Sequence, residues 1–137
     1  MAAQLYPQNG LSKPAVLATA NTNYDGTGTL VTVATGTATG KDSYKTLLMQ
    51  AGGTVSAGEL VFFTYDTVQY VPFCIVPVEP WTAKYTAPNQ TPLWGGVIDL
   101  IKLLGQPLKL PSTSHTVKAL TRISETFYVW LGGDNFV

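Results

Sequence analysis

The stretch ELVFFTYDTVQYVPFCIV (residues 59–76) contains the two most strongly predicted strands of the chain. Residues 59–65 and 70–76 are rich in β-branched and aromatic side chains, which favour the pleated, half-buried surface of a sheet. The four residues between them, Asp66 to Gln69, are typical of the short loop of a β-hairpin. This stretch therefore predicts a pair of antiparallel strands.

Similar short runs occur on both sides of this pair, separated by Gly, Asp, Asn and Pro. They cover residues 15–20, 29–35, 44–50, 81–85, 116–122 and 126–131. About eight short strands at this spacing predict an all-β fold, an antiparallel β-sandwich of the jelly-roll type. Residues 97–104 differ, because Asp99 and Lys102 are three positions apart in an apolar run that ends before Gly105. This pattern predicts one short helix.

The domain organisation follows from length and from the first residues. A chain of 137 residues fits one domain. Residues 1–12 show no hydrophobic period and predict an extended N-terminal arm, followed by a single β-sandwich domain over residues 13–137. The arm has neither the basic nor the apolar segment of a signal peptide, and no run is long enough to span a membrane. We therefore expect synthesis in a cytoplasm and no membrane partner.

Charge is sparse. Only 12% of the residues are charged, against about 25% in an average domain, and eight basic residues balance eight acidic ones. Nucleic-acid binding needs a clustered basic face, so we expect no nucleic-acid partner. Two interpretations of the low charge remain: a bare surface rich in Thr and Ser, or a surface covered by partners. The large aromatic residues favour partners.

No group of residues predicts catalysis, a metal site or a cofactor. His115 is the only histidine and follows a Ser- and Thr-rich loop, without the pattern that surrounds a nucleophilic serine. Residues 21–26 (NTNYDG) copy the first half of a calcium loop, but its twelfth position is Thr32 instead of Glu, so a turn is the better interpretation. Cys74 lies between Phe73 and Ile75, which predicts a small buried side chain. We expect that the protein is not an enzyme.

Large apolar residues are the candidates for contact with other subunits. The predicted interface with other subunits consists of Leu5, Tyr6, Trp81, Tyr85, Trp94, Ile98, Ile101, Leu104 and Trp130. Tryptophans of this group could instead stack on sugars, together with Tyr85 and Tyr128, although such residues are more often found in cores and interfaces.

Three stretches carry a resemblance to known proteins: ANTNYDGTGTLVTV (20–33), AGGTVSAGELVFFTYD (51–66) and LTRISETFYVWLGGD (120–134). Together they resemble small β-sandwich structural proteins of tailed bacteriophages and prophages, some of which decorate capsids as trimeric cement proteins. Residues 88–110 depart from that pattern.

The resemblance implies a virion protein on the capsid exterior, a homotrimer that bridges subunits of the major capsid protein. A tail, baseplate or fibre component and a carbohydrate-binding module are the alternatives.

Overall fold

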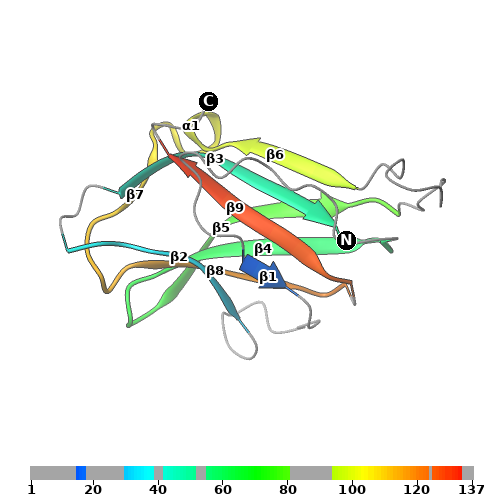
Figure 1. Ribbon diagram of the computed structural model, residues 1–137, viewed down its shortest axis with the longest axis horizontal. Coiled ribbons are helices and arrows are strands. Elements are labelled where there is room, and N and C mark those ends of the chain that lie inside the picture. Colours follow the sequence, from blue (N-terminus) through cyan, green and yellow to red (C-terminus); the bar gives the residue numbers. More distant parts are fainter. Residues whose placement is uncertain are drawn as a thin grey trace, which may run out of the picture.

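The computed structural model describes residues 15–17, 30–38, 42–51, 55–80, 94–123 and 125–133 (Figure 1). The described strands are β1 (Ala15–Leu17), β2 (Val31–Thr35), β3 (Asp42–Ala51), β4 (Gly58–Tyr65), β5 (Tyr70–Val78), β6 (Gly95–Asp99), β7 (Leu108–Leu110), β8 (Thr116–Thr121) and β9 (Phe127–Gly133). One described helix, α1 (Leu100–Leu104), follows β6 directly. The predicted arm (1–12) and the predicted strand 81–85 lie outside the described residues.

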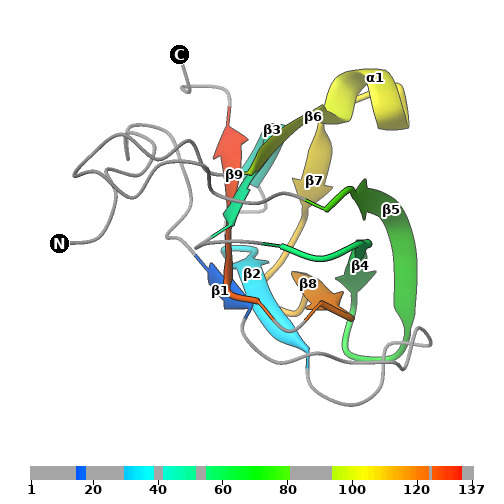
Figure 2. The same ribbon diagram turned by 90° about the vertical axis from the view of Figure 1, so that its right-hand side faces the viewer.

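The strands form two antiparallel sheets that face each other (Figure 2). One has the order β1-β9-β3-β6, with β7 also paired to β3, and the other has the order β2-β8-β4-β5. The pairs are nested: β4 pairs with β5, β3 with β6, β2 with β8 and β1 with β9. A long hairpin rolled into two sheets in this way is a jelly roll. The predicted all-β sandwich is confirmed.

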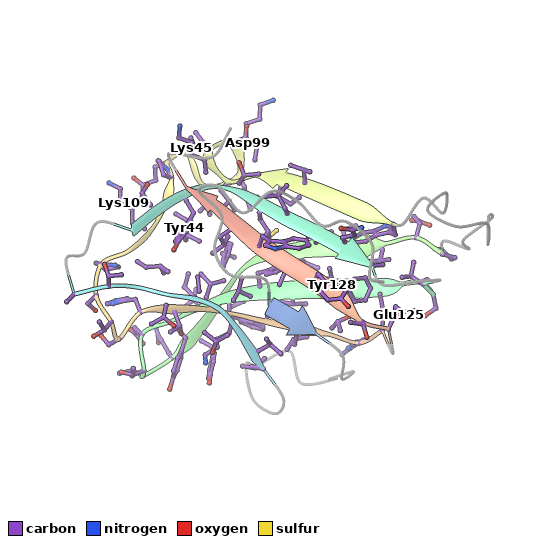
Figure 3. All side chains as sticks on the ribbon, viewed as in Figure 1. Tyr44, Lys45, Asp99, Lys109, Glu125 and Tyr128 are labelled. Atoms are coloured by element: carbon purple, nitrogen blue, oxygen red, sulfur yellow. The ribbon has the colours of Figure 1, made fainter. Side chains whose placement is uncertain are left out.

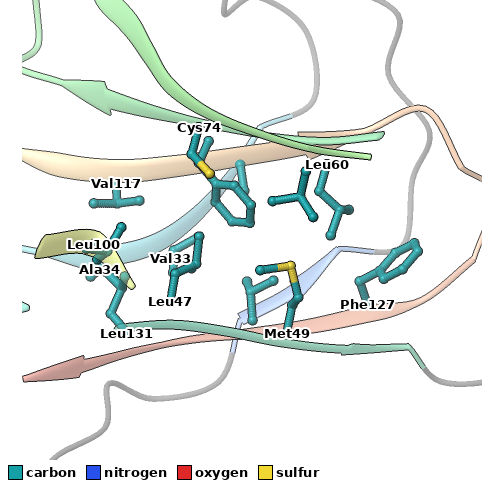
Figure 4. Close-up of a cluster of buried hydrophobic side chains, with 14 of the residues drawn as sticks. Val33, Ala34, Leu47, Met49, Leu60, Cys74, Leu100, Val117, Phe127 and Leu131 are labelled. Atoms are coloured by element: carbon teal, nitrogen blue, oxygen red, sulfur yellow. The ribbon is translucent and has the colours of Figure 1, made fainter. Parts of the chain in front are cut away.

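Apolar side chains fill the space between the sheets (Figure 3), while charged ones such as Lys45 and Lys109 project outward. Alternate residues of β3 and β4 point inward, among them Leu47 and Met49 of β3 and Leu60 of β4, all of which are completely buried (Figure 4). Each such side chain stabilises the fold by about 1.5–3 kcal/mol relative to an exposed position. The core accounts for the sandwich without any disulfide, since Cys74 is a free thiol.

The β4–β5 hairpin has the predicted position and a defined loop. The Asp66 carboxylate oxygen Oδ1 accepts hydrogen bonds from the backbone N–H groups of Val68 and Gln69, both at 2.9 Å. Thr67 has a left-handed backbone with φ of 75°, which the carboxylate–backbone bonds help to hold in place. Asp66 therefore closes the turn.

The helix is shorter than predicted, because its first half is the strand β6. Val97, Ile98 and Asp99 pair with β3. Asp99 ends the strand and caps the helix, since its Oδ1 accepts from the N–H groups of Ile101 (3.1 Å) and Lys102 (3.3 Å). Asp99, one of the two polar residues from which the helix was predicted, is thus the residue that caps its start. No helix within the described ranges has the length and apolar character of a membrane span.

Candidate functional site

The predicted interface residues lie in different environments. Outside the described residues are Leu5, Tyr6, Trp81 and Tyr85, so the structure places Trp94, Ile98, Ile101, Leu104 and Trp130.

Trp130 is buried, although it was predicted as an interface residue. Its side chain has 0% exposure. It lies on β9 between the core residues Val129 and Leu131, and therefore on the sheet face that points away from the core. Its register partner Leu48 is also buried there, and the Tyr128 ring stacks at 6.5 Å from the indole. A side chain without exposed surface offers a partner or a sugar no contact, so Trp130 is not available to either.

Trp94 has a structural position at the start of β6. Its ring packs edge-on against Phe127 with centroids 5.7 Å apart, and its carbonyl accepts a 2.8 Å hydrogen bond from the N–H of Ala51. Ile98 and Leu104 are half-buried and pack against the core. Among the predicted candidates in the described ranges, Ile101 alone is strongly exposed, at 39%.

Sequence reasoning missed most of the exposed apolar residues. Within the described residues, the large hydrophobic side chains with substantial exposure are Val68, Val71, Ile75, Val97, Ile101 and Leu103. All belong to the β4–β5 loop, β5, β6 or α1. Alternation along β5 was the available signal, because the buried residues Cys74, Val76 and Val78 leave Ile75 on the opposite face.

These elements lie on one side of the sandwich. Strands β5 and β6 are the edges of the two sheets opposite β2 and β1, respectively, and α1 follows β6 (Figure 2). We call the part formed by β5, β6, α1 and the β4–β5 loop the β5–β6 side. Single exposed apolar side chains are common on proteins, but those of the described residues share this one side.

A pocket of about 160 Å³ at one end of the sandwich contains His115 and Asp66 among its lining residues. The His115 Nδ1 lies 2.7 Å from the Ser112 Oγ, which lies 2.9 Å from the Ser114 Oγ. The backbone N–H groups of Gln69 and Val68 lower the pKa of Asp66, with a smaller effect from His115. Asp66 is thus engaged by its own turn, and no hydrogen bond joins it to His115. The serine–histidine contact belongs to a local turn and does not form a serine–histidine–aspartate relay.

The part of the chain that the structure describes contains neither a metal site nor a reactive thiol. No cluster of three or more His, Cys, Asp or Glu residues occurs there. The calcium-loop sequence at residues 21–26 lies outside it. Burial raises the pKa of the Cys74 thiol, which keeps it protonated and weakly nucleophilic. The interpretation of Cys74 as a buried apolar residue is confirmed.

No protein-family model, curated protein or solved structure matches the chain.

Proposed function

We propose that the protein is a virion structural protein that decorates the exterior of a phage capsid and bridges major capsid protein subunits. The observation that carries the proposal is that the strongly exposed large apolar side chains of the described residues all lie on the β5–β6 side of a charge-poor jelly roll. Jelly rolls are common among viral capsid proteins and lectins. Because one fold hosts many functions, the surface carries more weight than the topology.

Two of the three stretches that resemble phage proteins contain interior strands of the sheets. Residues 51–66 include β4, and residues 120–134 include β9. Both are interior strands of their sheets, β4 between β8 and β5, and β9 between β1 and β3. The similar stretches therefore favour a shared framework and not a shared reaction.

The proposed mechanism is burial of apolar area between subunits. Each square ångström of apolar surface removed from water contributes about 25 cal/mol. A trimer on a symmetric shell makes several such contacts at once, and linked contacts add to a much higher overall affinity. The shell is then held together without contact with the packaged DNA.

Binding of the purified protein to phage heads that lack it tests the proposal. Ile75→Lys places a charge on the β5–β6 side, at a position 56% exposed, so we expect normal folding and loss of head binding. The control Thr35→Lys places the same charge on the exposed β2 position at the opposite side. Equal binding of both variants, or no binding of the wild type, would overturn the proposal. Light scattering across a dilution series tests the trimer.

Two alternatives have separate tests. A tail, baseplate or fibre component would be labelled along the particle axis in electron micrographs, whereas a decoration protein would be labelled across the head. A carbohydrate-binding module shares the jelly-roll fold with lectins, and it would change its tryptophan fluorescence with a glycan. Trp130 is buried and Trp94 half-buried, so we expect no such change from these two residues.

A further inference from the structure

Sheet edges expose unpaired backbone N–H and C=O groups, and natural proteins protect them against unwanted strand pairing. The edge strand β5 contains Pro72 and Pro77. A proline in a paired edge strand directs its nitrogen outward and removes a donor from the free edge. Strand β5 is therefore a poor template for another strand.

The edges β2 and β1 are protected in other ways. Strand β2 has a register shift between Thr32 and Ala34, and Thr32 Oγ1 accepts a hydrogen bond from the Lys118 ammonium group. Bulges and lysine side chains both discourage strand addition. Strand β1 has only three residues. The small strand β7, which also lies on the outer side of β3, is equally short.

Strand β6 has none of these protections. Its sequence, GGVID, contains no proline and no lysine, and among the described residues it pairs with β3 alone. Its two neighbours along the chain are Trp94, which anchors its start, and α1, which begins after Asp99. The strand is therefore held in place, and no described strand pairs with its second edge.

The register identifies the backbone groups at that edge. The N–H of Ala51 donates to the carbonyl of Trp94, so these two residues form a hydrogen-bonded pair. Such pairs alternate along an antiparallel ladder. Gly96 and Ile98 consequently bond to β3, while Gly95, Val97 and Asp99 direct their N–H groups outward. Val97 also has a side chain that is 60% exposed.

We propose that the open edge of β6 receives an extended peptide segment of the partner as an added strand. The inference rests on the proposed function, so the segment belongs to the major capsid protein. Backbone hydrogen bonds to Gly95 and Val97 provide the register, as in other cases of strand addition. The segment carries an apolar residue beside Val97, on the same sheet face.

The dimensions favour a peptide over a second copy pairing through its own β6. Five residues of strand extend over about 17 Å. Two such short edges would bury much less than the roughly 1,200 Å² of a stable interface between folded proteins. A partner that contacts the protein at other places on the lattice needs less buried area from the added peptide alone.

Hydrogen exchange of backbone amides tests the proposal on the intact protein. In the free protein, we expect the outward amides of Gly95 and Val97 to exchange fast and those of Gly96 and Ile98 to exchange slowly. On decorated heads, we expect exchange at Gly95 and Val97 to slow by at least about tenfold. Fast exchange at both positions in head-bound protein would overturn the inference and leave the proposed function intact. Failure to bind heads at all would overturn both.

A substitution provides a second measurement. Val97→Pro removes an outward N–H and no ladder bond to β3, so we expect loss of head binding with an unchanged circular dichroism spectrum. Val97→Thr keeps the N–H and the β-branched shape and should bind within about threefold of wild type. Wild-type affinity of a folded Val97→Pro variant contradicts strand addition, and if that variant does not fold, the exchange measurement decides.

Discussion

Thr121, the last residue of β8, provides a test of how the end of β8 is joined to the start of β4. It is completely buried, and its Oγ donates to the carbonyl of Glu59 and accepts from the N–H of Ile123, both at 3.0 Å. Thr121→Val keeps the shape of the side chain and removes both hydrogen bonds. At about 1 kcal/mol for each bond, we expect a loss of about 2 kcal/mol in the free energy of unfolding.

Thr121→Ser is the matched control, because it keeps the hydroxyl and removes one methyl group, which costs about 0.8 kcal/mol. Urea unfolding, followed by tryptophan fluorescence, measures both variants. With a denaturant dependence of about 2 kcal/mol per M, the midpoint should fall by about 1 M for Val and about 0.4 M for Ser. A midpoint for Thr121→Val equal to or above that of Thr121→Ser would refute the reasoning, because apolar burial would then outweigh the hydrogen bonds.

Three further outcomes are expected. Gly36→Ala should unfold at a markedly lower urea concentration than Gly105→Ala, because a Cβ at Gly36 would lie 2.1 Å from the carbonyl oxygen of Ser112, whereas Gly105 has open space and costs only the roughly 1 kcal/mol of its left-handed φ of 81°. Cys74 should react with iodoacetamide only as fast as the protein unfolds, because its thiol is buried. Its raised pKa means that its contribution to the stability of the fold is present below the pKa of the thiol in the unfolded chain and is lost as pH rises above about 8.5. Thermal unfolding at pH 7 and pH 10 measures this loss, with Cys74→Ala as the control. Asp66 has a lowered pKa, so its contribution is present above its unfolded pKa and is lost as pH falls through the acid range; Asp66→Ala should flatten the acid side of the stability profile, and an unchanged profile would contradict the role of the carboxylate in the turn.

The strands with clear composition were predictable from the sequence. Strands β4 and β5 are rich in aromatic and β-branched residues and joined by a short loop, so local preference and the final fold agree there. Strand β6 was missed because Gly95 and Gly96 have low strand propensity and because Asp99 belongs to both a strand end and a helix cap. Strand β7 has three residues, too few for alternation to be recognised.

The candidate site was less predictable than the fold. The sequence identifies Trp130 as large and apolar, but the exposure of a side chain depends on what covers its face of the sheet. The open edge of β6 depends on the order of strands, which joins segments far apart in the chain. Single-sequence patterns report neither property.

The nested pairing also determines when the protein can fold during synthesis. Strand β4 meets β5 across a short loop, but β1 pairs with β9, with Ala15 opposite Val129. An antiparallel pair so distant in sequence forms late, because the loop must close before the contacts stabilise it. The first sheet therefore remains incomplete until β9 has left the ribosome, and until then β3 lacks one neighbour. We expect this sheet to be completed only after β9 has been synthesised, with unprotected strands exposed until then.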